Sequence, residues 1–565
     1  MTKFMQDNNT FDAIVVGSGI TGGWAAKELC EKGLKTLVIE RGRKLEHVKD
    51  YTTANTPIWN LPHRNQPTAE DRETYPIQTQ IYAFNEGTKH LWIKDKDHPY
   101  TTPPKQPFVW LRGNHVGGRS LMWGRQSYRW SDLDFEANAK EGIAVDWPIR
   151  YKDIAPWYSY VEKFIGISGQ AENLPQLPDS EFLPPMDMFC VEKRIKSSIE
   201  EKWPKRAMTI GRVANLTKAH NGRSACQHRN LCYRGCPYGA YFSSQSSTLP
   251  AAAATGNMTL RPNSLVETLL FDKDTSKATG VRVLDTETGK TVEYKAKIIF
   301  LCASTLGSTQ ILLQSTSDRF PNGFSNASGE LGHNLMDHLF NLHAHADFDG
   351  DLDKYYNGQR PNGIYIPRFR DVWDKHPDYL RGFGFQGSAR RDGWEGKKSQ
   401  PGIGADFKKS MTQLGGWKMS LYGFGEILPY HHNKVQLNPN KKDIHGLPTL
   451  YIETKLGENE LKMKKDILAS GKEMLEAAGG KNVAIWDGDA PMGNGVHEMG
   501  TARMGHDPKT SVLNRWNQCH EAKNVFVTDG SCMTSASCVN PSLTYMALTV
   551  RAVDYAVKEL NKQNL

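Results

Sequence analysis

The feature that most constrains this chain is a glycine pattern near its start, GSGITG at residues 17–22. The pattern follows a short apolar run, FDAIVVG at 11–17, which predicts a buried parallel strand. Residues 21–32 predict a helix, and residues 35–40 predict a second strand. Together they form a βαβ unit of the usual size, so the chain is predicted to begin with a Rossmann-type nucleotide-binding unit.

The positions of the glycines suit a bound dinucleotide. Gly17 permits the tight turn after the strand, Gly19 lets the backbone approach a pyrophosphate at the helix N-terminus, and Gly22 lets helix and strand pack closely. Glu40 ends the second strand, where its carboxylate can bind ribose hydroxyls, and the Glu-Arg-Gly run with Arg41 favours FAD over NAD. A glycine-rich turn without a ligand is the alternative, which the strand, helix, spacing and carboxylate together disfavour.

Strands that complete the sheet are predicted at both ends of the chain, because 298–303 and 524–530 are further buried runs. Short strand candidates over 340–455 indicate a separate antiparallel sheet. We therefore expect a mixed α/β and α+β fold, in which a discontinuous Rossmann-type FAD-binding domain carries an inserted antiparallel-sheet substrate domain. The expected ranges are 1–50, 105–150, 205–335 and 490–565 for the FAD domain, and 336–489 for the substrate domain with contributions from 51–104 and 151–204.

Charge and hydropathy exclude several classes of protein. The 565 residues carry a net charge of +8, and the densest basic run, Lys462–Lys465, follows Glu458 and Glu460 on a predicted helix. That pattern is typical of a solvated helix face, so no nucleic-acid partner is expected. No run approaches the roughly 18 apolar residues of a membrane span. The polar start, Met1 to Phe11, is expected to carry no export signal of its own.

Two C-terminal segments combine polar groups that suit alcohol chemistry. One is HEMGTARMG, which begins at His497, and the other runs from the DGS triplet at Asp529 to Asn540-Pro541. Oxidation of an alcohol needs a base for the hydroxyl proton, and histidine suits this role because its pKa lies near neutral pH. It also needs a donor for the developing alkoxide, which a side-chain amide provides. Taken alone, a single histidine is more often structural, so these residues leave both interpretations open.

Six sequence blocks occur in an order that resembles one enzyme family. They are GSGITGG with the later ERG, GNHVGGRS at 113–120, ASTLGSTQILL at 303–313, LGHNLMDH at 331–338, HEMGTARMG, and the final DGS and NP motifs. They span nearly the whole chain and resemble the glucose-methanol-choline (GMC) oxidoreductases. The resemblance implies an FAD-dependent enzyme that acts on CH–OH groups, with His497 as the catalytic base and Asn540 as its partner.

The same resemblance implies how FAD is held. Asp529 and Gly530 are expected to contact the flavin phosphate and ribitol, and Val266 to lie near the adenine. Some pyranose oxidases link FAD covalently through a histidine just before a tryptophan that matches Trp123. Met122 stands at that position and cannot make the link, so FAD is expected to be bound non-covalently. The other FAD-binding residues expected from the matching motifs are Gly117, Gly118, Ser120 and Pro541.

Three of the nine cysteines, Cys226, Cys232 and Cys236, lie close together in the sequence. The odd count and the length of the chain disfavour a disulfide framework. The spacing resembles the cluster-binding segment of bacterial FAD-dependent glucose dehydrogenases, which implies a 3Fe-4S cluster held by three thiolates. Two alternatives stay open, namely reduced thiols that only pack and a zinc site completed by His228.

Within the family, the whole pattern most resembles the bacterial glucoside 3-dehydrogenases, which oxidise the 3-hydroxyl of glucosides or disaccharides to 3-keto sugars. The alternatives are a gluconate or polyol dehydrogenase, an oxygen-using pyranose oxidase, and a non-catalytic flavin subunit for electron transfer. The segments 340–455 and 51–105 are expected to form the sugar pocket. The resemblance also implies a small signal-bearing subunit, a cytochrome c-type acceptor and export to the periplasm with that subunit, with a cytoplasmic location as the alternative.

Overall fold

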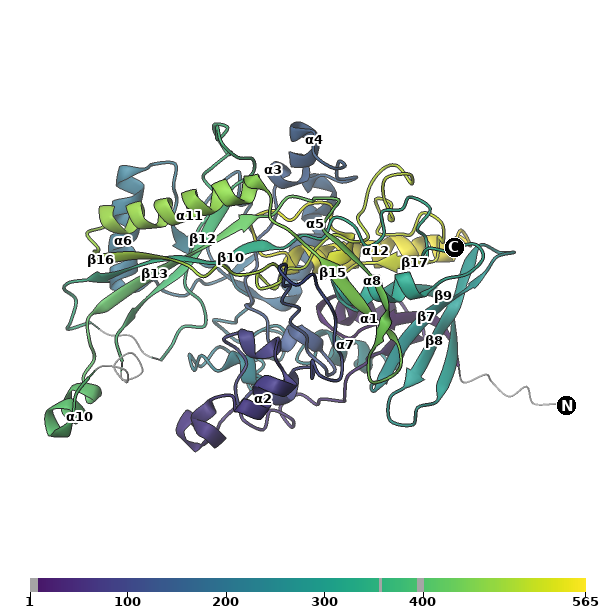
Figure 1. The fold of residues 1–565 in the computed structure, drawn as a ribbon, viewed down its shortest axis with the longest axis horizontal. Helices are drawn as coiled ribbons and strands as arrows, with labels where there is room; N and C mark the ends of the chain where they lie inside the picture. Colours follow the sequence, from purple (N-terminus) through teal and green to yellow (C-terminus); the bar gives the residue numbers. More distant parts are fainter. Residues whose placement is uncertain (1–8, 355–357, 394–400) are drawn as a thin grey trace.

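The computed structural model describes residues 9–354, 358–393 and 401–565. Two large sheets organise these residues, one of seven strands and one of six (Figure 1).

The seven-stranded sheet joins strands from both ends of the chain. Its strands are β1 (Thr10–Val16), β2 (Thr36–Ile39), β6 (Met258–Arg261), β7 (Ser264–Asp272), β8 (Lys277–Asp285), β9 (Thr291–Leu301) and β17 (Val525–Val527). The strands β6, β2, β1, β9 and β17 run parallel, whereas β7, β8 and β9 form an antiparallel meander. Val16 lies opposite both Ile39 and Leu301, so the C-terminal ends of the parallel strands meet at one edge. Open α/β sheets bind ligands at this edge, and the glycine turn begins there.

Two helices from opposite ends of the chain pack on this sheet, α1 (Ile20–Glu31) and α12 (Ser542–Asn561). Ala25 and Leu29 of α1 share one buried cluster with Val553 of α12 and with Phe300 and Phe526 of the central strands. Because this core includes both termini of the nucleotide unit, the first glycine motif and the last catalytic segment fold as one body.

The six-stranded sheet is antiparallel and has the order β16-β10-β13-β12-β11-β5. Its strands are β5 (Thr209–Ile210), β10 (His338–Phe348), β11 (Ile364–Ile366), β12 (Phe383–Arg391), β13 (Trp417–Glu426) and β16 (Lys481–Asp487). Helix α11 (Glu458–Ala477) lies across one face (Figure 1). A Cβ at Gly423 would stand 2.2 Å from Cγ2 of Ile467, so the missing side chain lets the helix approach the sheet closely.

Further helices and two small strand pairs lie between the strands of the two large sheets along the chain. The helices are α2 (Ala69–Thr74), α3 (Asp132–Phe135), α4 (Ala137–Glu141), α5 (Tyr151–Ile165), α6 (Cys190–Lys202), α7 (Thr248–Ala254), α8 (Thr305–Gln314) and α10 (Gly404–Thr412). The remaining strands form two small pairs, β3 (Ile167–Ser168) with β4 (Phe182–Leu183), and β14 (Lys434–Lys442) with β15 (Pro448–Glu453).

The predicted fold class is confirmed, since a parallel sheet built from both ends of the chain carries a separate antiparallel sheet. The exact domain limits stay a prediction. One strand crosses the predicted limits, because Thr209–Ile210 pairs with β11 in the six-stranded sheet although 205–335 was assigned to the FAD domain. Over the described ranges, no helix has both the length and the apolar composition needed to cross a bilayer.

Candidate active site

The glycine turn after β1 has the geometry that its sequence predicts. Gly17 has a φ of +96°, and a Cβ there would lie 2.4 Å from the carbonyl oxygen of Cys302. A Cβ at Gly22 would lie 1.9 Å from the carbonyl oxygen of Gly17, so helix α1 packs against the turn with no room for a side chain. Gly19, by contrast, faces open space with no atom within 4 Å of a Cβ. That space lies at the N-terminus of α1, where backbone amides and the helix dipole favour a phosphate.

The carboxylate of Glu40 ties the turn to the second strand. Its Oε2 accepts hydrogen bonds from the backbone N–H of Ser18 at 3.1 Å and from the Ser18 hydroxyl at 2.6 Å. Its Oε1 accepts the N–H of Gly42 at 2.9 Å. Oε1 accepts one bond and retains a further acceptor site, so the predicted binding of a ribose hydroxyl is compatible with these bonds.

A second glycine block covers the first. Gly117 and Gly118 both have positive φ, at +88° and +46°, and a Cβ at Gly118 would lie 3.7 Å from the Cα of Gly19. The N–H of Gly117 donates to the Ser18 hydroxyl at 2.9 Å, and the Ser120 hydroxyl donates to the carbonyl of Gly117 at 2.6 Å. Two segments about a hundred residues apart thus form opposite walls of one backbone-lined slot.

One cavity runs from this slot to the C-terminal catalytic segments. The predicted residues that line it are Gly17, Gly19, Glu40, Arg41, Gly118, Ser120, Val266, His497, Asp529, Gly530 and Asn540. Three predicted FAD-binding residues lie outside its lining, namely Gly22, Gly117 and Pro541. Gly22 and Gly117 shape the turns described above, and Pro541 caps α12. The segments predicted to form the sugar pocket also contribute, since Tyr82, Trp92 and Leu447 line the same cavity.

Asp529 lies at the end of β17 and is fixed by serines. One carboxylate oxygen accepts the Ser308 hydroxyl at 2.5 Å, and the other accepts the N–H and hydroxyl of Ser531 at 3.0 and 2.6 Å. Burial raises the pKa of Asp529 despite these bonds. A carboxyl group held in this way can present an acceptor to a ligand hydroxyl without moving.

His497 and Asn540 lie together, as the mechanism requires. The Asn540 side-chain nitrogen stands 3.2 Å from Nε2 of His497, and Nδ1 of His497 stands 2.9 Å from Nδ1 of His338. Nε2 of His338 points at the carbonyls of Ser537 and Ala536, at 2.9 and 3.2 Å.

These contacts fix the tautomers. Because carbonyls only accept, Nε2 of His338 carries the proton and its Nδ1 accepts the Nδ1 proton of His497. Nε2 of His497 is then an unprotonated acceptor, to which Asn540 donates. Gln386 is the last member of this series of hydrogen bonds. Its Nε2 donates to Oδ1 of Asn540 at 2.6 Å and sets the orientation of that amide.

Burial keeps both imidazoles neutral. It lowers the pKa of His338 to about 4 and lowers the pKa of His497 well below its ordinary value, with the nearby His338 and Arg119 adding to the effect on His497. A neutral imidazole whose unprotonated nitrogen lies at a cavity can accept a hydroxyl proton once a substrate hydroxyl takes the place of the amide N–H.

Comparison with known proteins identifies the family. The sequence profile for GMC oxidoreductase matches residues 11–340 and 429–549. The chain belongs to the GMC oxidoreductase family. It is therefore an oxidoreductase of CH–OH groups, and the predicted family and enzyme class are confirmed.

Two sequence relatives and one solved structure extend over nearly the whole chain. The 2-methyl-1,2-propanediol dehydrogenase of Mycolicibacterium austroafricanum is 29% identical and covers 96% of this chain and 94% of its own. The fructose dehydrogenase large subunit of Gluconobacter japonicus is 24% identical, with 98% of each chain covered. The formate oxidase of Aspergillus oryzae has a TM-score of 0.61 at 14% identity, covering 99% of this chain and 100% of that one, which shows the shared fold.

The cavity of this GMC oxidoreductase fits FAD on its own chemistry. The open Gly19 backbone at the start of α1 suits a pyrophosphate, and the carboxylates of Glu40 and Asp529 suit hydroxyl groups. The Tyr545 hydroxyl is buried in the cavity wall without a hydrogen-bond partner among the described residues, so it can serve a bound ligand.

The loop that carries His497 is held by a buried carboxyl group that the sequence did not single out. Asp337 accepts the backbone N–H groups of Gly493, Gly495 and His497 at 2.7, 3.0 and 3.1 Å. Burial and the nearby Glu498 raise the pKa of Asp337 to about 7. Asp337 and His338 are the last two residues of the LGHNLMDH block. This adjacent polar pair was the sequence signal that could have predicted their place at the site.

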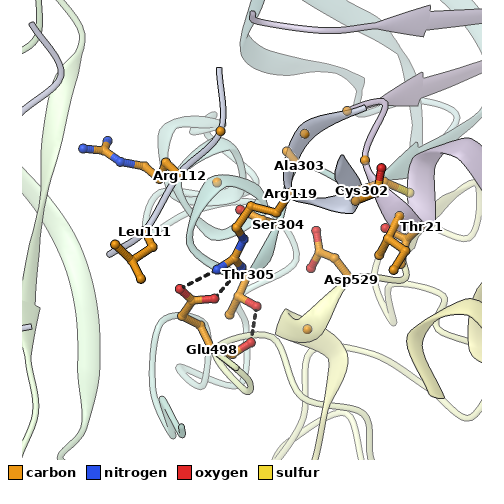
Figure 2. Close-up of a pocket in the computed structure, with 18 of the residues that line it drawn as sticks. Thr21, Leu111, Arg112, Arg119, Cys302, Ala303, Ser304, Thr305, Glu498 and Asp529 are labelled. Atoms are coloured by element: carbon orange, nitrogen blue, oxygen red, sulfur yellow. Dashed lines mark hydrogen bonds and ion pairs between the residues drawn. The ribbon is translucent and has the colours of Figure 1, made fainter. Parts of the chain in front are cut away.

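A bidentate ion pair forms another part of the wall that sequence analysis missed. Arg119 donates to both carboxylate oxygens of Glu498, at 3.1 and 2.6 Å (Figure 2). Thr305 donates to the carbonyl of Glu498 at 2.5 Å, and its position relative to Arg119 is visible in the same view (Figure 2). The residue next to the base is therefore anchored to the second glycine block and to α8 at once.

The cysteine trio lies beside the cavity, since Tyr233 lines it and directly follows Cys232. Burial, with Cys232 and Cys236 nearby, raises the pKa of Cys226 to about 11, so this thiol is protonated at neutral pH. In the part of the chain that the structure describes, no set of three or more His, Cys, Asp or Glu side chains is arranged to hold a metal ion. Three thiols are donors that suit an iron-sulfur cluster, and the cluster stays a prediction.

Proposed function

We propose that this chain is an FAD-dependent dehydrogenase that oxidises a ring hydroxyl of a sugar or glycoside, with the 3-hydroxyl of a glucoside or disaccharide as the specific target. One observation carries the proposal: Nε2 of His497 is an unprotonated acceptor that points at the Asn540 amide in the cavity wall. The cavity that holds this pair also reaches the glycine turn. The likeness to a fructose dehydrogenase large subunit supports a sugar as substrate.

The chain's own residues supply the proton chemistry. A substrate hydroxyl takes the place of the Asn540 N–H at Nε2 of His497, which removes its proton as the carbinol carbon is oxidised. An amide nitrogen carries two N–H groups, so Asn540 can then donate to the substrate oxygen and stabilise its negative charge. When bound, FAD supplies the hydride acceptor.

The hydrogen-bond chain behind the base supports this step. The Nδ1 proton of His497 stays on His497 and remains hydrogen-bonded to Nδ1 of His338 throughout the reaction. Only Nε2 of His497 therefore changes its protonation state. Asp337 holds the backbone of the loop, which limits movement of the imidazole away from the substrate.

The route of the electrons is a finer part of the proposal. The cysteine pattern supports a three-iron cluster on Cys226, Cys232 and Cys236, and the likeness to a large subunit supports a small partner subunit. A cytochrome c-type acceptor and export to the periplasm with that subunit belong to the same proposal. The proton chemistry above depends on none of these. Iron content of anaerobically purified protein tests the cluster, and acid precipitation tests non-covalent FAD by releasing it.

A second candidate substrate class is a small diol or other polyol. The relative with 29% identity is a 2-methyl-1,2-propanediol dehydrogenase, which favours this class. The test is turnover by the FAD-loaded protein, with a dye as electron acceptor, on glucose, methyl glucoside, sucrose, gluconate and 2-methyl-1,2-propanediol. A 3-keto product from a glycoside supports the first proposal, and turnover of the diol alone supports the second. Peroxide release in place of dye reduction would contradict the assignment as a dehydrogenase.

A further inference from the structure

The open face of the six-stranded sheet carries a row of side chains that begins at the catalytic pair. In the strand register, Gln386 lies opposite Tyr422, Tyr422 opposite His343, and His343 opposite Trp486. Directly opposed residues of antiparallel strands point to the same face. These four side chains therefore cross β12, β13, β10 and β16 in one line.

The other face of this sheet is the covered one. Ile467 and Met463 of α11 approach within 2.2 and 2.6 Å of the Cβ positions of Gly423 and Gly425, the neighbours of Tyr422 and Phe424 in β13. Since successive residues of a strand alternate between faces, Tyr422 and Phe424 point away from α11.

The uncovered face points towards the catalytic residues. Gln386, at one end of the row, donates to the side-chain oxygen of Asn540 at 2.6 Å. The first residue of β10 is His338, the acceptor of the His497 proton. Phe340 and Phe424 pack at 5.7 Å between ring centroids on the stretch between His338 and the row.

The four side chains of the row are all accessible in part, with half-buried His343 lying between the two exposed aromatic residues. Gln386 is half-buried, whereas Tyr422 is 44% exposed and Trp486 is 55% exposed. The rings of Tyr422 and His343 lie 5.2 Å apart, and those of His343 and Trp486 lie 6.4 Å apart and are stacked. From Gln386 to Trp486 the row crosses three gaps between neighbouring strands, a distance of about 14 Å. A single sugar ring with its reacting carbon at His497 is too small to cover that distance.

We propose that this row is a subsite for the ring attached to the sugar under oxidation, so that the preferred substrate is a disaccharide or a ring-bearing glycoside and not a free hexose. The inference rests on the proposed function, because it takes the oxidised ring to lie at His497 and Asn540. The C–H face of a pyranose, or the face of an aromatic aglycone, packs on the faces of Tyr422 and Trp486. His343 and Gln386 supply polar groups for hydroxyls at its edge.

The test uses the FAD-loaded enzyme and two variants, Trp486→Ala and Tyr422→Ala. Each is expected to raise KM for a disaccharide and for an aryl glucoside about tenfold, with little change for methyl glucoside or glucose. The matched control is Trp373→Ala, which removes a tryptophan that is 48% exposed. Nζ of Lys205 lies 5.9 Å from the centre of the Trp373 ring, and the next residue, Arg206, pairs with Glu473 of α11 on the covered side of the sheet. Comparing the increase in KM for the disaccharide with that for the aryl glucoside shows which kind of ring the row prefers.

A binding measurement separates this inference from the proposed function. Calorimetric titration of the FAD-loaded His497→Ala protein with the disaccharide reports binding without turnover, and addition of Trp486→Ala should weaken that binding about tenfold. If the parent enzyme oxidises no sugar, the proposed function fails whatever the row does. If it oxidises glycosides and the row variants leave KM and binding unchanged, or raise KM for glucose equally, the subsite is overturned. A change confined to the KM for a protein electron acceptor would also overturn it and assign the face to a partner.

Discussion

The two ends of the cavity are built in different ways. At the nucleotide end, backbone atoms form the walls, and Gly17 and Gly22 are required because a Cβ would collide with carbonyl oxygens. At the catalytic end, side chains form the site, and the hydrogen-bond chain Gln386–Asn540–His497–His338 draws on four separate segments. The nucleotide end depends on glycines that have no side chain, whereas the catalytic end depends on how several side chains are aligned. Substitutions at the two ends should therefore fail in different ways.

The largest expected effect is at the catalytic end. His497→Ala should lower kcat about 10³-fold, because the base for the hydroxyl proton is lost. FAD content should stay at the parent level, since the glycine turn is untouched. Stopped-flow reduction of the bound flavin by substrate measures the rate, and the visible spectrum measures the FAD.

The control is His506→Ala, an exposed histidine nine residues further on, which should behave like the parent. Loss of FAD together with activity in His497→Ala would show that the two ends are not independent. Parent-like turnover would remove His497 as the base.

The next effect tests alignment without removing the base. His338→Leu leaves the Nδ1 proton of His497 without an acceptor, so kcat should fall about 10²-fold through misplacement of the imidazole. His338→Gln can still accept that proton through its side-chain oxygen and should recover most of the rate. KM should change little in both, which distinguishes loss of alignment from loss of substrate binding. Equal rates for the leucine and glutamine variants would contradict the assigned direction of the hydrogen-bond chain.

A smaller effect is expected at the nucleotide end. Glu40→Gln replaces one of the two acceptor oxygens with an NH2 group and removes the negative charge, so the bonds to Ser18, Gly42 and a ribose hydroxyl can no longer all form. FAD should therefore bind roughly tenfold more weakly, which equals about 1.4 kcal/mol. At saturating FAD, kcat should equal that of the parent. Titration of the apoprotein with FAD measures the affinity. A reduced kcat at full FAD occupancy would break the distinction between the two ends.

The pH dependence should show the smallest change within the ordinary working range. Burial lowers the pKa of His497 in the folded protein, so the base stays neutral as the pH falls through 6.5 and becomes protonated only below it. The acid limb of kcat/KM should therefore lie below pH 6.5, as a profile of flavin reduction against pH would show. A limb at or above 6.5 would mean that the imidazole is solvated and that the catalytic end is less enclosed than the structure indicates.

The sequence predicted the nucleotide end well because its signals are local. The strand, the turn and helix α1 follow one another within about 30 residues, and the glycine spacing reflects close contacts inside that unit. The predicted fold class and family are confirmed for the same reason, since each block keeps its own pattern. His497 and Asn540 were named from family motifs, and the structure places them 3.2 Å apart.

The supporting residues of the catalytic end escaped prediction. Nothing local marks Gln386, which stands in an alternating strand like its neighbours, or Arg119, which pairs with a carboxylate 379 positions away. The cluster predicted from the spacing of Cys226, Cys232 and Cys236 stays a proposal, since no set of three or more described His, Cys, Asp or Glu side chains is arranged to hold a metal ion.

Local sequence determined the glycine turn and the strands and helices around it, because each depends on neighbours within one turn or one strand. The catalytic pair, His497 and Asn540, could be named only because the family motifs identify them. Tertiary structure decided the tautomer of His497, the buried Asp337 beneath its loop, and the alignment of Gln386, Tyr422, His343 and Trp486 across four strands. Those features depend on strand register and on desolvation, which arise only when segments hundreds of residues apart pack together.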